Sequence, residues 1–137
     1  MKLNNTSQYA IRIVAYIVQN GSKNKYNAKD ISKKLSIPYK YLTKIMSLLV
    51  EGNIILSSRG REGGYNIAKE LSEIKIGDIL EAVKESLHQE ECVLGNHLCN
   101  KMEKCILHDK WLFTKNSMQE MFKNTTLDDF IAKGVQR

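Results

Sequence analysis

The stretch NAKDISKKLSIPYKYLTKIMSLLVEG, residues 27–52, decides the fold, because it predicts two helices joined by a turn of about three residues. Asn27 is a helix-capping residue type, and Pro38 falls in the first turn of the second helix, where its missing N–H would have no partner in any case. Gly52 ends that helix after about Glu51. The apolar residues predicted to face inward are Ile31, Leu35, Tyr41, Ile45, Leu48 and Leu49. This arrangement is a helix-turn-helix.

A helix is predicted before this unit, over Ser7–Asn20, with Gly21 just beyond its end. Its apolar positions recur at helical spacing at Tyr9, Ile13, Tyr16 and Ile17. After the unit, the segment NIILSSRGREGGYNIAK predicts a hairpin with strands over residues 54–58 and 65–68. A hairpin directly after a helix-turn-helix is a wing. Its glycine-rich tip leads into a strand and not a helix, so it is not a nucleotide-binding loop.

Two longer helices are predicted in the second half of the chain. The first runs from about Lys75 to Leu87, and its apolar face is Ile76, Ile79, Leu80, Val83 and Leu87. The second runs from about Lys104 to Lys123, roughly 30 Å, with the apolar stripe Leu107, Trp111, Met118, Met121 and Phe122. A short terminal helix, capped by Thr125 or Thr126, carries Leu127, Phe130 and Ile131.

The long apolar stripe favours a homodimer, because a domain this small has little further core to cover it. A helix folded back on its own domain is the alternative. The fold class predicted is mainly α with a small β-hairpin wing: a winged helix-turn-helix DNA-binding domain plus a long dimerisation helix. We divide the chain into a winged region (1–70), a connecting helix (71–91), a loop that contains all three cysteines and is predicted to bind a metal cluster (92–108), and a dimerisation and C-terminal helix region (104–137).

Composition narrows the class of protein. The 137 residues are enough for one domain with a core that needs no disulfides. No apolar run approaches the ~20 residues of a membrane helix, and the start MKLNNTSQYAI lacks the features of a signal peptide. We therefore expect a cytoplasmic protein with no membrane partner.

Charge is divided unevenly between the two halves. Residues 1–69 carry twelve Lys/Arg and three acids, whereas residues 70–137 carry nine Lys/Arg and twelve acids. A first half with net charge +9 suggests contact with a polyanion. A solvated lysine-rich surface is the alternative reading of the charge alone.

All three cysteines lie in CVLGNHLCNKMEKCILH, residues 92–108. Thiols stay reduced in the cytoplasm, and an odd count argues against a disulfide framework. Thiolates with an imidazole suit an iron–sulfur cluster or zinc, although the gaps of six and five residues are wider than usual for zinc. Metal-free redox thiols and inert burial also stay open. If Cys105 opens the long helix, His108 lies one turn along the same face, so both can aim at one site.

These segments resemble a known family. SIPYKYLTKIMSLL, SSRGREGGYNIAK and IKIGDILEAV are similar to the recognition helix, the wing and the next helix of winged-helix transcription regulators of the IscR and NsrR type. CILHDKW resembles the iron–sulfur branch in particular. The resemblance covers nearly the whole chain, and the combination of RGxxGGY with a Cys-Cys-Cys-His set is specific.

The resemblance implies a homodimer that binds partly palindromic, double-stranded promoter DNA and senses an iron–sulfur cluster held by Cys92, Cys99 and Cys105. In the IscR branch a histidine at the position of His108 completes a [2Fe-2S] site. The NsrR branch instead uses an acidic residue near the N-terminus, where this chain has Gln8. That difference favours [2Fe-2S] over [4Fe-4S]. The first cysteine gap is one residue longer than is usual in the IscR branch.

DNA contacts are predicted from the second helix of the helix-turn-helix and from the wing. The residues are Pro38, Tyr39, Lys40, Tyr41, Thr43, Lys44, Arg59, Gly60 and Arg61. Lys40 and Lys44 would hold phosphates, whereas Arg59 would enter the minor groove. For Tyr41, a place in the core is the alternative.

The function predicted is transcription regulation by an iron–sulfur sensor that controls cluster biogenesis or redox and nitrosative stress genes. The alternatives are a cluster-free regulator that senses thiol oxidation or sulfur metabolism, and an iron–sulfur carrier or electron-transfer protein. The sequence shows no nucleophile–base pair, paired catalytic carboxylates or cofactor loop, so we expect neither an enzyme nor a small-molecule substrate.

Overall fold

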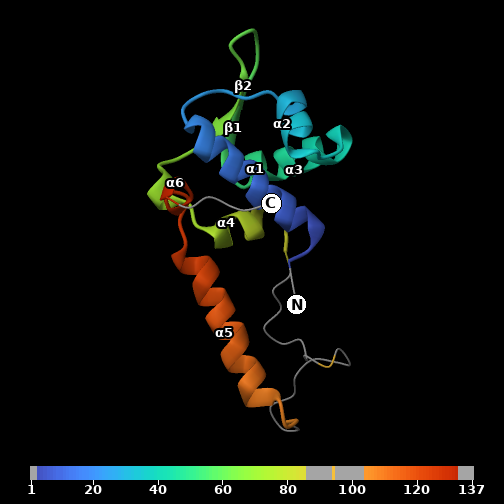
Figure 1. The fold of residues 1–137 in the computed structure, drawn as a ribbon, viewed down its shortest axis with the longest axis vertical. Coiled ribbons are helices and arrows are strands. Elements are labelled where there is room, and N and C mark those ends of the chain that lie inside the picture. Colours follow the sequence, from blue (N-terminus) through green and yellow to red (C-terminus); the bar gives the residue numbers. More distant parts are fainter. Residues whose placement is uncertain (1–2, 86–93, 95–103, 133–137) are drawn as a thin grey trace.

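The computed structural model describes residues 3–85, 94 and 104–132 of the chain. Its elements are α1 (Asn5–Gly21), α2 (Ala28–Leu35), α3 (Tyr39–Glu51), β1 (Ile55–Ser58), β2 (Gly64–Ile67), the 3-10 turn η1 (Leu71–Glu73), α4 (Ile76–Ala82), α5 (His108–Asn124) and α6 (Asp129–Ala132). Helix α1 runs through the centre and contacts α2, α3, α4, α6 and β2. Helix α1 and the helices packed on it (α2, α3, α4 and α6) form what we call the head of the molecule. The β1–β2 hairpin projects from one end of the head and α5 extends from the other (Figure 1).

The predicted fold class is confirmed, and the helix-turn-helix has the predicted signals at its ends. The Asn27 side chain accepts a hydrogen bond from the Asp30 N–H at 2.8 Å and so caps α2. Ser36 has a left-handed backbone (φ 55°) that turns the chain out of α2. Pro38 then caps α3, and Gly52 follows its last residue. The two helices are therefore set by local chemistry at the predicted residues.

The buried face of α3 differs from the predicted one. Its buried residues are Leu42, Ile45, Met46 and Leu49. Tyr41 and Leu48, which were predicted to face inward, are only half-buried. The buried stripe starts at Leu42, which lies about 100° round the helix from Tyr41. Tyr41 consequently lies at the edge of the core.

One hydrophobic core joins the elements of the head. Its largest fully buried side chains are Ile13, Ile17, Ile31, Ile37, Leu42, Ile45, Met46, Leu49, Ile55, Ile74, Ile79 and Leu127. Of the positions predicted for α1, Ile13 and Ile17 are fully buried, whereas Tyr9 and Tyr16 are half-buried and pack against this core. Leu127 comes from the C-terminal part, so the chain closes back on its first half.

The wing is an antiparallel pair in which Ile55 lies opposite Ile67 and Ser58 opposite Gly64. Strand β1 starts one residue later than predicted and ends as predicted, whereas β2 starts and ends one residue earlier than predicted. The loop before α2 forms an isolated antiparallel bridge to β2, in which Tyr26 and Tyr65 exchange N–H···O bonds of 3.0 and 2.8 Å. This pairing ties the base of the wing to the loop between α1 and α2.

Helix α4 ends at Ala82, earlier than the predicted Leu87, which itself lies outside the described residues. Lys84 adopts a left-handed backbone (φ 60°). The N–H groups of Lys84 and Glu85 then donate to carbonyl oxygens in the last turn of α4, at 3.0 and 2.9 Å. These bonds form a Schellman ending without a glycine, which no glycine-based reading of the sequence predicts.

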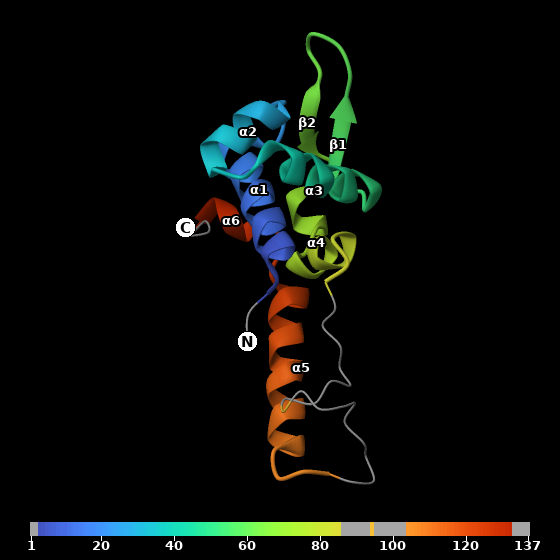
Figure 2. The same ribbon diagram turned by 90° about the vertical axis from the view of Figure 1, so that its right-hand side faces the viewer.

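Helix α5 starts at His108, not at Lys104, and the predicted apolar stripe is poorly covered. Lys115 is the only buried side chain of this helix. Trp111, Met118 and Phe122 are half-buried, whereas Met121 is exposed. Within the described part of the chain, no residue of the stripe is therefore fully buried. Helix α5 extends away from the head (Figure 2).

The C-terminal segment returns to the head through backbone pairing. Lys75 and Thr126 form an isolated antiparallel bridge, and the Leu127 N–H donates to the Ile74 carbonyl at 2.9 Å. Leu127 and Phe130 are buried as predicted, but Ile131 is exposed. The Thr126 N–H donates to an Asp129 carboxylate oxygen at 3.0 Å, so Asp129 binds the backbone that precedes α6.

Across the described ranges, no helix has both the length and the apolar character needed to cross a membrane.

The close approach of α3 and α4 gives a test of the packing. A Cβ on Gly52 would lie 2.5 Å from the Ala82 Cβ, whereas a Cβ on Gly77 would meet nothing nearer than 3.6 Å. We expect Gly52→Ala to lower the free energy of unfolding by about 1–3 kcal/mol, because the helices must separate. Gly77→Ala should raise it by up to about 1 kcal/mol through helix propensity. Urea denaturation measures both, and equal effects would contradict the packing at Gly52.

Candidate nucleic-acid interface and cysteine segment

The start of α3 and the tip of the wing lie toward the same end of the molecule, away from α5 (Figure 2). Tyr39, Lys40 and Lys44 are exposed on α3, and Thr43 is half-buried. The Thr43 hydroxyl donates to the Lys40 carbonyl at 2.9 Å. This bond ties the hydroxyl to the backbone within the first turns of α3. The exposed face of the helix therefore offers two ammonium groups and a phenol to a partner.

Tyr41 points away from this face. Its hydroxyl forms a hydrogen bond with the Thr6 hydroxyl on α1. Its ring packs edge-on against Tyr9, with centroids 5.5 Å apart and an interplanar angle of 81°. The guanidinium of Arg12 lies 5.7 Å from the centroid of the same Tyr9 ring. These contacts support the alternative role of Tyr41, as a residue that packs α3 onto α1.

The tip of the wing exposes Arg59, Gly60 and Arg61. Gly60 has a φ of 99° and open space around its missing Cβ, so glycine is needed there for its backbone. At Gly63 a Cβ would lie 2.3 Å from the Ser58 carbonyl oxygen, so glycine is needed there for space. The two glycines therefore allow a tight turn between the exposed arginines and β2.

The base of the wing is held by Tyr26. Its phenol donates to the Gly21 carbonyl at 2.9 Å, and its ring lies edge-on to Tyr16. Burial raises the pKa of Tyr26, while a hydrogen bond with Asn24 lowers it in part. The phenol therefore stays protonated at neutral pH and can keep donating.

The basic side chains of this surface have no acidic partners within the described part of the chain. Lys40, Lys44, Arg59 and Arg61 make no ion pair there. Cations that have no ion pair among the described residues suit the phosphates of a nucleic acid. The predicted basic residues are all exposed, two on α3 and two at the tip of the wing.

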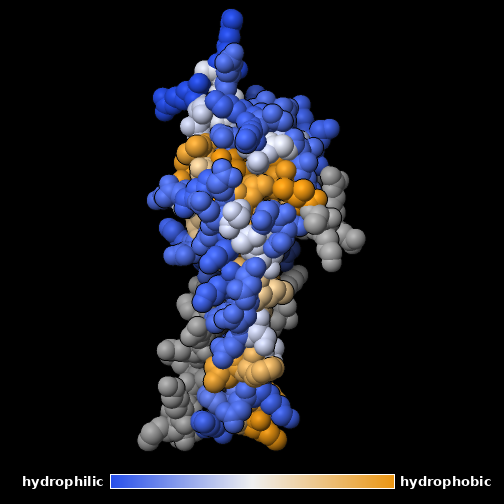
Figure 3. Space-filling view, turned by 90° about the vertical axis from the view of Figure 1, so that its left-hand side faces the viewer, coloured by the Kyte–Doolittle hydropathy of each residue, from blue (hydrophilic) through white to orange (hydrophobic). Residues whose placement is uncertain are grey.

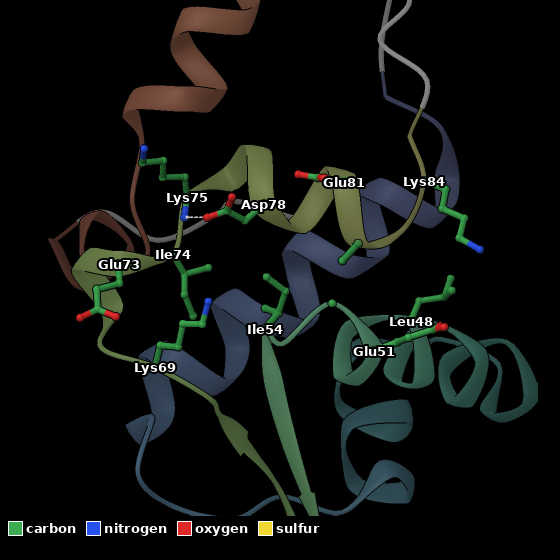
Figure 4. Close-up of a pocket in the computed structure, with 12 residues that line it drawn as sticks. Leu48, Glu51, Ile54, Lys69, Glu73, Ile74, Lys75, Asp78, Glu81 and Lys84 are labelled. Carbon is green, nitrogen blue, oxygen red and sulfur yellow. Dashed lines mark hydrogen bonds between the residues drawn. The ribbon is translucent and has the colours of Figure 1, made fainter.

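A cleft of about 580 Å³ lies between the end of α3, η1 and α4 (Figure 4). Its charged lining residues are Glu51, Lys69, Glu73, Lys75, Asp78, Glu81 and Lys84. The Asp78 carboxylate accepts a hydrogen bond from the Lys75 backbone N–H at 2.9 Å and caps α4. Among the residues that the structure describes, no thiol, imidazole or predicted site residue lines the cleft. Its charged groups are of both signs and do not form a recognisable catalytic set.

The structure describes part of the cysteine segment. Cys105 is exposed and precedes α5, contrary to the prediction that it opens the helix. The His108 N–H donates to the Cys105 carbonyl at 3.0 Å, so the two residues stand at the ends of one four-residue turn. Cys92 and Cys99 lie outside the described residues. Within the residues that are described, no three His, Cys, Asp or Glu side chains gather as a metal group.

The sequence patterns did not indicate the contact between Glu85 and Ser7. Glu85 accepts hydrogen bonds from the Ser7 hydroxyl at 2.6 Å and from the Asn4 N–H at 3.2 Å. Ser7 is fully buried, although serine in a helix is usually at the surface. The pairing spans 78 positions of sequence, so no local pattern indicates it.

A helix-turn-helix followed by a basic wing defines a winged-helix DNA-binding protein. The family model for Rrf2, described as an iron-dependent transcriptional regulator, matches residues 3–133. The chain therefore belongs to the Rrf2 family, and the predicted relationship to IscR-type regulators is confirmed. It is a transcriptional regulator and not an enzyme.

Relatives and solved structures agree with this assignment. Protein rrf2 of Nitratidesulfovibrio vulgaris is 31% identical over 131 residues, which are 96% of this chain and 87% of that protein. The transcriptional regulator IscR of Pectobacterium atrosepticum is 28% identical over 96% of this chain and 79% of its own. The structure of CymR, the global cysteine regulator of B. subtilis, superposes with a TM-score of 0.80 at 20% identity and covers 96% of this chain and 97% of its own.

We predict that Arg59→Ala lowers affinity for the specific DNA sequence by about tenfold to a hundredfold, as loss of one specific base contact does. Fluorescence anisotropy at fixed salt, with a duplex selected from a random pool by the wild-type protein, measures this. Lys123→Ala, an exposed lysine on α5, is the matched control and should have little effect. An unchanged affinity of Arg59→Ala would remove the wing tip from the interface.

Proposed function

We propose that the protein is a homodimeric cytoplasmic regulator whose promoter binding is controlled by an iron–sulfur cluster, with Cys92, Cys99, Cys105 and His108 as ligands. The observation that carries the proposal is the donor set. Cys105 is exposed and adjoins His108 through one turn, in a chain that belongs to a family described as iron-dependent. Such a cluster would supply a group that can be lost or oxidised. Its loss or oxidation would change the protein and so signal the supply or redox state of the metal.

The type of cluster follows from the remaining donors. Thiolates and imidazole are the side chains that hold iron–sulfur clusters, and histidine ligation occurs in [2Fe-2S] centres. Gln8, at the position where the NsrR branch has its acid, donates its amide to the Leu3 carbonyl at 2.6 Å. An amide engaged in this way is a poor substitute for a carboxylate ligand. We therefore favour [2Fe-2S] with His108 as the fourth ligand.

DNA would be read by α3 and the wing together. Pro38, Tyr39 and Thr43 lie at the start of α3, where major-groove contacts are made in this class of protein, and Lys40 and Lys44 would bind phosphates. Arg59 would enter the minor groove, with Arg61 beside it and Gly60 leaving space. Tyr41 would not contact DNA itself but would hold α3 in place through its contacts to α1.

The dimer would form through α5. Exposed apolar side chains gather toward the end of α5 that lies away from the head (Figure 3). They are Ile106, Leu107, Leu112 and Phe113, with Ile106 93% and Phe113 74% exposed. Large apolar side chains exposed close together are typical of a protein–protein interface. A second copy of the chain would cover these side chains, and two heads would then read two half-sites.

A second candidate is a regulator without a cluster, which senses thiol oxidation or sulfur metabolism. The observation that favours it is the close superposition on CymR, named a global cysteine regulator. The exposed Cys105 thiol would then be a redox-active group.

Iron and acid-labile sulfide, counted in protein purified without oxygen, separate the candidates. We expect about two of each per chain with structured visible absorption, as a [2Fe-2S] cluster requires. Cys105→Ala should abolish the absorption, and His108→Ala should shift or weaken it, whereas His88→Ala is the matched control. Iron and sulfide near four per chain would support [4Fe-4S]. Colourless wild-type protein would leave the cluster-free regulator.

The dimer proposal is tested by sedimentation velocity. Phe113→Glu, with or without Leu112→Glu, should raise the dimer dissociation constant by tenfold or more, on the order of 1.4 kcal/mol, because charge enters an apolar contact. Thr114→Glu adds the same charge without removing an apolar side chain and should act less. A wild-type sedimentation profile for the double variant would place the interface elsewhere.

A further inference from the structure

The first turn of α1 is held by Glu85, a residue 78 positions further along the sequence than Ser7. Glu85 accepts the Ser7 hydroxyl at 2.6 Å through one carboxylate oxygen and the Asn4 N–H at 3.2 Å through the other. Asn4 in turn accepts the Ser7 N–H at 2.8 Å, so the three residues form a closed set of hydrogen bonds. Ser7 has no exposed surface. The carboxylate therefore satisfies a hydroxyl that water does not reach.

Charge supports this arrangement. The first turn of α1 contains no acidic residue of its own. A helix N-terminus carries partial positive charge and unpaired N–H groups, and a carboxylate stabilises it. Glu85 supplies that carboxylate from 78 positions away. Hydrogen bonds to an ionised acceptor are roughly twice as strong as those between neutral groups.

The same turn of α1 also holds the recognition helix. Thr6, between Asn4 and Ser7, hydrogen-bonds to the Tyr41 hydroxyl. Tyr9, one turn further on, packs edge-on against the Tyr41 ring. Tyr41 is the third residue of α3, next to Lys40. The start of α3 is thus attached to the start of α1, which is attached to Glu85.

We propose that Glu85 is a positioning residue for the recognition helix. It fixes the first turn of α1, and the Thr6–Tyr41 bond carries that position to the residues of α3 that would meet DNA. Glu85 itself is fixed by the Schellman ending of α4, through its N–H bond of 2.9 Å to the Leu80 carbonyl. In the sequence it precedes Cys92 by seven residues.

The test compares specific with non-specific DNA binding. The affinities of each variant for a duplex selected by the wild-type protein and for a scrambled duplex of equal length are measured at one salt concentration. We expect Glu85→Ala to lower the ratio of the two affinities by about fivefold to tenfold, the effect of losing one hydrogen-bonded contact. A purely structural role would lower the folded fraction and reduce both affinities alike, which leaves the ratio unchanged.

Two further variants sharpen the test. Glu85→Gln keeps the shape and an acceptor oxygen, so it should restore part of the ratio. Tyr41→Phe breaks the link to Thr6 and should lower the ratio by itself, and adding Glu85→Ala to it should then have little further effect. Glu81→Ala, which removes an exposed carboxylate on the same helix α4, is the matched control.

The inference rests on the proposed docking of α3 against DNA, and Lys40→Ala tests that docking separately. If Lys40→Ala binds both duplexes as the wild type does, the α3 interface itself is wrong and the positioning role falls with it. If Lys40→Ala weakens binding but Glu85→Ala leaves the ratio unchanged, docking stands and the positioning role of Glu85 is refuted. Additive effects of Glu85→Ala and Tyr41→Phe would also overturn it.

Discussion

The burial of α1 is the constraint on which the rest of the structure depends. Ala10, Ile13, Val14 and Ile17 are all fully buried, and the helix contacts α2, α3, α4, α6 and β2. Apolar surface on several sides of one helix cannot be covered by a single neighbour, so the helix-turn-helix, the wing and the C-terminal segment all pack on the same support. The position of α3, which carries candidate DNA-contact residues, is therefore set by its packing on α1.

The wing is stabilised by contacts with residues outside its two strands. A two-stranded hairpin is marginally stable on its own in water. Here Tyr26 adds backbone pairing to β2, and its phenol reaches the Gly21 carbonyl at the end of α1. Gly64 (φ 138°) permits the close approach, since a Cβ there would lie 2.8 Å from the Tyr26 carbonyl oxygen. The base of the wing is thus anchored to the same helix as α3, while its tip stays narrow and exposed.

Local chemistry made much of the fold predictable. The Asn27 cap, Pro38 before α3 and the glycines of the wing each act within a few residues, and each stands where the sequence indicates. Long-range contacts were not predictable. Lys84 ends α4 in a conformation that usually calls for glycine, and Tyr41 turns toward Thr6 because α1 lies beside it. The basic candidates for DNA contact are exposed, whereas Cys92 and Cys99 remain predictions outside the described residues.

Cys105 and Glu85 are connected to the start of α3 by different routes through the described structure. Cys105 and His108 lie at the start of α5, whose 17 residues extend roughly 25 Å before the chain re-enters the head. From there, a route to α3 runs along α5 and then through its contacts with α4 or the Lys75–Thr126 bridge. Glu85 contacts Ser7, which is next to Thr6, the residue that binds Tyr41. The route from Glu85 needs only these two hydrogen-bonded contacts, so it is the shorter mechanical path to the start of α3.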